Sequence, residues 1–135
     1  MAVKRLVNMV QTLATQGINQ TTLITATATG NSREFYDFAS ADAAVFYVDC
    51  SAVVGSGTLI LTLLERDPAT GVFFGAADAP VFTTISAPIA SVRYTLSPCL
   101  GEAYVLNWAV SGFTSVTFSC VAQLISWGVT GTSHA

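Results

Sequence analysis

Side chains able to perform catalysis are few in this 135-residue sequence, and their spacing brings none of them together. A serine or cysteine hydrolase needs a base beside its nucleophile, usually a histidine. The single histidine, His134, lies one residue from the C-terminus, where chains are commonly disordered, so we assign it to the tail. Glycosidase chemistry needs two carboxylates across one bond. The acids available for it are scattered: Asp37, Asp42, Asp49, Glu65, Asp67, Asp78 and Glu102. We therefore expect no catalytic residue and no enzyme activity.

Metal, phosphate and disulfide sites are not predicted either. The segment Gly55–Gly57 lacks the lysine and the following helix of a phosphate-binding loop, and no loop has the DxDxDG pattern of a calcium site. The three cysteines, Cys50, Cys99 and Cys120, are an odd number without CxxC spacing or a nearby histidine. We expect buried, reduced thiols, with a Cys50–Cys120 bridge as the alternative. No cofactor and no metal are expected.

Aromatic side chains are the remaining groups that could bind a ligand, by stacking on sugars or bases. Trp108 alternates with apolar residues and is expected in the core. Tyr36 and Trp127 are better placed for a binding surface, and they support an alternative function as a sugar-binding module. Tyr47 and Tyr104 complete the set considered for stacking.

The N-terminal segment carries apolar residues at spacings of three and four, which predicts a short amphipathic helix over residues 3–14. The alternative is an extended arm that becomes ordered only against a neighbour. In either form we expect this segment, residues 1–20, to stand apart from a sandwich domain at 21–135 and to pack on another subunit. The apolar residues concerned are Val3, Leu6, Val7, Val10 and Leu13.

From Thr21 onward the apolar residues recur with period two and are rich in β-branched and aromatic types, which is typical of strands. Asp67–Gly71 reads as a tight hairpin with proline at its first corner and glycine in the left-handed position. Seven or eight short strands predict an all-β fold, a single antiparallel β-sandwich. Jelly-roll and Ig-like strand orders remain open. The strands are expected at 21–28, 43–53, 58–66, 72–74, 81–85, 91–97, 102–110 and 115–124.

The composition is apolar, with 52% hydrophobic residues and only 10% charged, where about 25% charged is usual. Five basic residues, spread from Lys4 to Arg93, cannot neutralise a run of phosphates, so no nucleic-acid partner is expected. Polar residues interrupt every apolar stretch before it could span a membrane, and Asn8, Gln11 and Thr12 break any signal-peptide core. No membrane partner is expected. A net charge of −3 gives weak mutual repulsion and favours association.

The outward faces of the predicted strands are less polar than a solvated sandwich requires. Contiguous apolar residues there would mark a contact surface, unless loops or the N-terminal segment cover them. We predict that Ile60, Leu64, Phe73 and Phe74 contribute to a subunit interface. The other outward apolar positions are Val45, Tyr47, Val105 and Val121.

Several motifs, taken in order, resemble small β-rich virion proteins of tailed bacteriophages, and within that group the capsid decoration, or cement, proteins. The similarity spans about residues 21–122. The motifs are TATG at Thr27–Gly30, GTLILTLLERDPATG at Gly57–Gly71, Arg93 ahead of a Leu-x-Pro, and NWAVSGFTSVTFS at Asn107–Ser119.

This resemblance implies a non-enzymatic protein, assembled as a homotrimer, that binds the major capsid protein on the outer surface of the virion and braces the shell. The protein would be made in the host cytoplasm. Tail, neck and head-fibre components remain alternatives to the capsid role.

Overall fold

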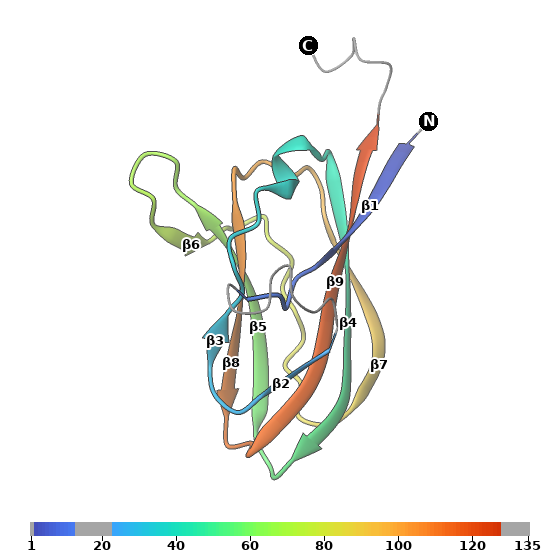
Figure 1. Cartoon of the computed structure of the whole chain (residues 1–135), viewed down its shortest axis with the longest axis vertical. Coiled ribbons are helices and arrows are strands. Elements are labelled where there is room, and N and C mark those ends of the chain that lie inside the picture. Colours follow the sequence, from blue (N-terminus) through green and yellow to red (C-terminus); the bar gives the residue numbers. More distant parts are fainter. Residues whose placement is uncertain (1, 13–22, 128–135) are drawn as a thin grey trace.

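The computed structural model describes residues 2–12 and 23–127, which form two antiparallel β-sheets packed face to face (Figure 1). One short 3-10 helix, η1 (Asp37–Ser40), lies between the third and fourth strands. The strands are β1 (Ala2–Asn8), β2 (Ile24–Ala26), β3 (Gly30–Asn31), β4 (Ala43–Val54), β5 (Thr58–Arg66), β6 (Phe73–Gly75), β7 (Ile89–Leu96), β8 (Tyr104–Ser111) and β9 (Ser115–Trp127). The predicted all-β sandwich is confirmed.

The strand order decides between the jelly-roll and Ig-like topologies, which the sequence left open. The five-stranded sheet, sheet A, has the order β1–β9–β4–β7, with β2 pairing the beginning of β9. The four-stranded sheet, sheet B, has the order β3–β8–β5–β6. An Ig-type sandwich would keep its strands in the sheets ABED and CFG. Here every pair of consecutive strands except β1–β2 and β5–β6 is divided between the two sheets, which is the interlocked Greek-key arrangement of a jelly roll.

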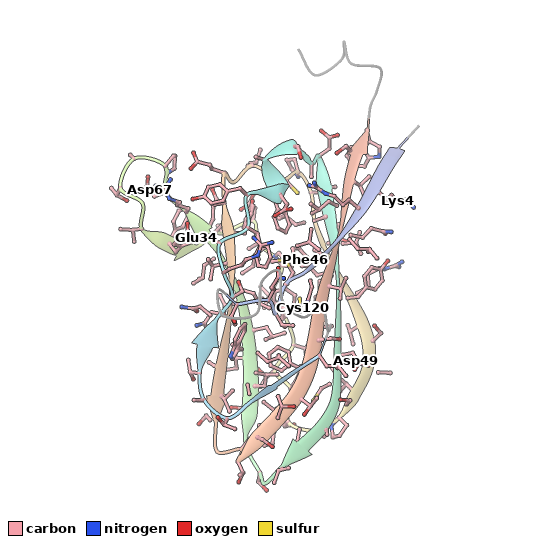
Figure 2. The ribbon with its side chains drawn as sticks, viewed as in Figure 1. Lys4, Glu34, Phe46, Asp49, Asp67 and Cys120 are labelled. Atoms are coloured by element: carbon pink, nitrogen blue, oxygen red, sulfur yellow. The ribbon has the colours of Figure 1, made fainter. Side chains whose placement is uncertain are left out.

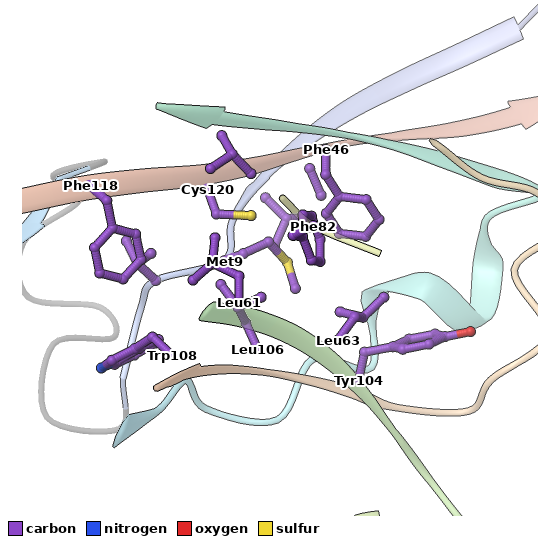
Figure 3. Packing of buried hydrophobic residues seen from close by; sticks show 14 of the residues in the cluster. Met9, Phe46, Leu61, Leu63, Phe82, Tyr104, Leu106, Trp108, Phe118 and Cys120 are labelled. Carbon is purple, nitrogen blue, oxygen red and sulfur yellow. The ribbon is translucent and has the colours of Figure 1, made fainter. Parts of the chain in front are cut away.

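The core lies between the sheets and is filled by the alternate side chains of β4, β5, β8 and β9 (Figure 3). Sheet A contributes Phe46, Phe118 and Cys120, and sheet B contributes Leu61, Leu63, Tyr104, Leu106 and Trp108. Trp108 is buried, as predicted, and its ring meets that of Phe118 edge-on at 5.8 Å. Strands β5, β8 and β9, and β4 as far as Cys50, therefore bury the face that their sequence alternation indicated.

The helix expected at residues 3–14 is wrong. Residues 2–8 form β1, which pairs with β9 in a register running from Ala2 opposite Trp127 to Asn8 opposite Val121. The chain then turns, and the Asn8 side chain accepts a hydrogen bond from the Val10 N–H at 3.2 Å. The turn brings Val10 into the core beside Val7, so two apolar residues three positions apart are both buried without a helix. Met9, within the turn, is buried as well. The segment is extended, but it pairs within its own chain.

Two smaller differences concern strands near the sheet edges. Residues 81–85 form no strand, because only Ile85 pairs, in an isolated bridge with Leu59. A register shift between Cys50 and Ala52 in β4 turns Ala52 outward, although the alternation placed it in the core. Such a bulge adds one residue on one strand and reverses which face the following side chains occupy.

Candidate functional site

A groove of about 490 Å³ lies on the outer face of sheet B. Leu64 of β5 and Val105 of β8 are directly opposed across the two strands and form an apolar floor. Phe73 of β6 lies on one side, and Tyr36, just before η1, on the other. The remaining lining residues belong to the segment that follows β3: Asn31, Ser32, Arg33 and Glu34. We call this site the sheet B groove.

Phe35, the residue before Tyr36, holds this wall of the groove in place. Phe35 is fully buried and exchanges two backbone hydrogen bonds with Tyr104, at 2.8 and 3.0 Å. Because side chains alternate along extended chain, this anchor turns Glu34 and Tyr36 outward. The Tyr36 hydroxyl donates to the Glu34 carboxylate at 3.0 Å, and this hydrogen bond is the main reason that the pKa of Tyr36 lies above its ordinary value.

Arg33 is held in place by several contacts at once. Its Nε donates to the Gln11 side chain at 2.9 Å and its Nη1 to the Glu34 carbonyl at 2.9 Å. The guanidinium carbon lies 4.1 Å from the centre of the Phe35 ring, and Nη2 is 4.0 Å from the Asp37 carboxylate. Arg33 therefore braces the wall through its Nε and Nη1 atoms.

The wall that carries Phe73 is the β5–β6 hairpin, which projects from the sandwich (Figure 1). The Asp67 carboxylate accepts the N–H groups of Ala69 at 2.8 Å and Thr70 at 3.4 Å, and these bonds lower the pKa of Asp67. Gly71 takes the positive φ of 76° that the turn requires. The turn predicted at Asp67–Gly71 is confirmed. Its geometry holds Phe73 on the same face as Leu64.

A second apolar surface covers the outer face of sheet A. Cross-strand partners share a face, so the registers place these side chains together. Leu6 and Val45 lie on either side of Gln123, and Tyr47 lies opposite Val121. Leu6 is 67% exposed and Trp127 53% exposed. We define surface A as Leu6, Val45, Tyr47, Val121, Ile125 and Trp127.

Surface A and the sheet B groove lie on opposite sides of the molecule. In Figure 2, Lys4 and Asp49 mark the side of sheet A, and Glu34 and Asp67 mark the side of sheet B. Lys4 and Arg93 flank surface A, and within residues 2–12 and 23–127 neither forms an ion pair. The two described ion pairs, Arg33–Asp37 and Arg66–Glu102, both lie on the other side.

The residues predicted for subunit contacts are divided between these regions and the core. Leu64 and Phe73 line the sheet B groove, and Ile60, 42% exposed, lies on the same face of β5. Phe74 pairs with Glu65 and so occupies the opposite face of the hairpin. Leu6 belongs to surface A.

Two of the N-terminal predictions are corrected by burial. Val7 and Val10 are 7% and 3% exposed and belong to the core of their own chain, so neither can contact a neighbour. Val3 pairs with Ser126 within β1. Leu13 lies outside the described residues. Among the outward positions, Val105 is almost fully covered, whereas Val45, Tyr47 and Val121 are half-buried.

Among residues 2–12 and 23–127, no cluster of three metal-ligating side chains occurs. Cys50, Cys99 and Cys120 are unpaired thiols; Cys50 and Cys120 are buried as expected, whereas Cys99 is half-buried. Burial raises the pKa of Cys120 to about 12 and that of Cys99 to about 11. His134 lies outside the described residues, and the carboxylates expected to be scattered include turn residues such as Asp67.

The two aromatic residues singled out for ligand binding are separated. Tyr36 lines the sheet B groove, and Trp127 ends β9 on surface A, where its backbone N–H donates to the Asp42 carboxylate at 2.6 Å. Sequence reasoning missed Asn31, Arg33 and Glu34, the polar part of the groove. The alternation of polar and apolar residues at Glu34, Phe35 and Tyr36 could have indicated that Phe35 is buried and that Glu34 and Tyr36 face outward.

Comparison with known proteins gives one informative match. No protein-family model matches the sequence, and no curated protein matches it. Among solved structures, the crystal structure of the SPBc2 prophage-derived protein YomS resembles this chain with a TM-score of 0.53 and 14% sequence identity. The similarity covers 93% of this chain and 96% of YomS. The protein shares its fold with a prophage-derived protein. No helix among the described residues is long and apolar enough to cross a membrane.

Proposed function

We propose that this protein is a structural component of a bacteriophage particle, a decoration or cement protein that binds the outer surface of the head. The single observation that carries this proposal is that large apolar side chains lie among the polar ones on both outer faces of the sandwich, with Leu6 and Trp127 exposed on sheet A and Ile60 exposed on sheet B. Antiparallel sheets usually keep one face on the core and leave the other solvated and polar. A molecule with surface A on one side and the exposed Ile60 with the half-buried Leu64 and Phe73 on the other suits a position between two neighbours.

The fold and the composition support the same role. The structural similarity to a prophage-derived protein agrees with a phage origin, and the order of motifs resembles decoration proteins. With 10% charged residues the chain has little charge to keep copies apart. Its partners would be the major capsid protein and further copies of itself, in a trimer, with neither nucleic acid nor membrane.

Stabilisation of the shell would follow from mass action. A protein that binds the intact shell, and not the disrupted one, stabilises it by about 2.7 kcal/mol per site when its free concentration is 100 times its Kd. Because many equivalent sites on a head are occupied together, these contributions add over the shell. The protein needs no chemistry for this effect, only contact area and affinity.

The test is the copy number of this chain in purified particles of the phage that encodes it, measured by quantitative mass spectrometry against the shell protein. A decoration protein is expected in hundreds of copies, comparable with the shell protein. A few copies per particle would overturn the head assignment and indicate a tail, neck or fibre component. Absence from particles would overturn the structural role altogether.

A further inference from the structure

We propose that the sheet B groove is a binding site for a neutral saccharide. This inference is independent of the particle role, because it concerns one groove on one chain. The groove has the composition of a ligand site, a largely apolar lining with a few polar groups, and its volume of about 490 Å³ falls within the usual range of about 300–1,000 Å³.

The first support is the placement of two aromatic side chains across an apolar floor. Tyr36 is 52% exposed on one side of the groove, and Phe73 is half-buried on the other. Leu64 and Val105 lie between them. The C–H face of a sugar ring is the part that packs on an aromatic ring, and a groove with an aromatic residue on each side offers that contact twice.

The second support is that the polar groups are already fixed. Tyr36 is tied to Glu34 at 3.0 Å, and Asn31 accepts a hydrogen bond from the Asn107 amide at 2.7 Å. With its oxygen held in this way, Asn31 has amide hydrogens to donate, while Glu34 has carboxylate oxygens to accept. These donors and acceptors are already ordered in the folded protein, so binding a ligand would cost little further side-chain entropy.

The third support is charge, which selects a neutral ligand. Arg33 directs its guanidinium toward Gln11, Asp37 and the Glu34 carbonyl. Arg33 and Glu34 both line the groove and carry opposite charges, so the lining offers no net positive charge to attract a phosphate or an acidic sugar. The hydroxyl groups of a neutral sugar can donate to Glu34 and accept from Asn31, so the groove fits a polyol better than an anion.

The test is nuclear magnetic resonance of the purified, ¹⁵N-labelled full chain titrated with neutral pentasaccharides of glucose, mannose and N-acetylglucosamine in different linkages. At least one is expected to shift the amides of residues 31–36, 64, 73 and 105 in a saturable manner. Tyr36→Ala is expected to weaken that binding at least tenfold, and Glu34→Gln by a smaller factor. Trp127→Ala is the matched control, an exposed aromatic residue outside the groove, and is expected to leave binding unchanged.

Three outcomes would overturn the proposal. One is that no pentasaccharide shifts these amides at millimolar concentration. Another is that Trp127→Ala abolishes binding while Tyr36→Ala, with an unchanged amide spectrum elsewhere, retains it. The third is that titration with shell protein, and not with any sugar, shifts the groove amides, which would make the groove a protein contact. Glu34→Gln keeps the side-chain shape, so its result is informative even if Tyr36→Ala alters the wall.

Discussion

Two hydroxyl groups complete the hydrogen bonding of β8 on either side of the short strand β3. Ser32 Oγ accepts the N–H of Leu106 at 2.9 Å in a buried position. Thr29 Oγ1 accepts the N–H of Val110 at 3.0 Å in an exposed position. Each hydroxyl accepts a backbone N–H of β8, one in a buried and one in an exposed position. Comparing the loss of stability when each is removed therefore shows how much burial adds to the cost of losing the hydrogen bond.

We expect Ser32→Ala to lower the free energy of unfolding by about 1–3 kcal/mol, because the buried Leu106 N–H loses its acceptor and water cannot easily replace it. Thr29→Ala is the matched control, expected to cost less than about 0.5 kcal/mol because water reaches the Val110 N–H. Urea unfolding followed by circular dichroism measures both. Equal losses for the two variants would contradict this account.

The buried thiols make a second prediction at the scale of single residues. A thiol reacts as its thiolate, and burial raises the pKa of Cys99 to about 11 and that of Cys120 to about 12. At pH 7 we expect slow alkylation of Cys99 by iodoacetamide and no alkylation of Cys50 or Cys120 until the protein unfolds. Mass spectrometry of peptides from native and urea-treated protein checks this. Rapid native labelling of Cys120 would show that the core around it opens.

At the scale of elements, the β5–β6 hairpin depends on the turn that Asp67 caps. Hydrogen bonds from Ala69 and Thr70 depress the pKa of Asp67 in the folded protein. A depressed carboxyl pKa contributes stability that is fully present above the unfolded value of about 3.9 and is lost as the pH falls through the folded value. The hairpin, and with it Phe73, is therefore expected to loosen in acid.

We expect the Ala69 amide resonance and its protection from hydrogen exchange to change as the pH falls below about 4, while core amides of β9 do not change. Asp67→Ala should show the loosened hairpin at neutral pH, because the acceptor is removed. Asn at this position retains an acceptor that does not ionise in this range, so Asp67→Asn should remove the pH dependence. If the variant Asp67→Asn titrates like the wild type, another group controls the hairpin.

The strand β1 is the element in which adjacent residues have opposite roles. Val7 is 7% exposed in the core, and Leu6 is 67% exposed on surface A. We expect Val7→Asp to destabilise the chain by about 3 kcal/mol or more, since an unpaired charge enters the core. Leu6→Asp should change stability by less than about 0.5 kcal/mol. Thermal or urea unfolding of the two variants provides the comparison, and equal destabilisation would mean that β1 does not hold this register.

At the scale of the whole molecule, the exposed apolar side chains on the outer faces of both sheets predict association. Leu6→Asp and Ile60→Asp place a charge on surface A and on the outer face of sheet B without entering the core. If the protein forms the proposed trimer, at least one of these variants is expected to be monomeric in light scattering and to show lower occupancy on particles. These single changes are sharper than removal of residues 1–15, which would also strip β1 from sheet A. A surface whose variant alters neither measurement is not the contact.

The sequence by itself determined the secondary structure of most of the chain and the residues of the core. The alternation in β4, β5, β8 and β9 indicates which side chains face inward, because the period of a strand is a local property. The turn at Asp67–Gly71 was also readable, because proline, aspartate and glycine act on the backbone beside them.

Only the tertiary structure decided the jelly-roll order, the strand β1 and the sheet B groove. Each depends on contacts between distant parts of the chain, such as Ala2 opposite Trp127 and Leu64 beside Phe73 and Tyr36. An isolated apolar pattern cannot show its partner: the spacing of Val7 and Val10 suits a helix as well as a strand that turns into a core. Pairing of β1 with β9 provides backbone hydrogen bonds and buries Val7. These contacts join residues far apart in the sequence, so the local pattern of apolar residues could not predict the strand.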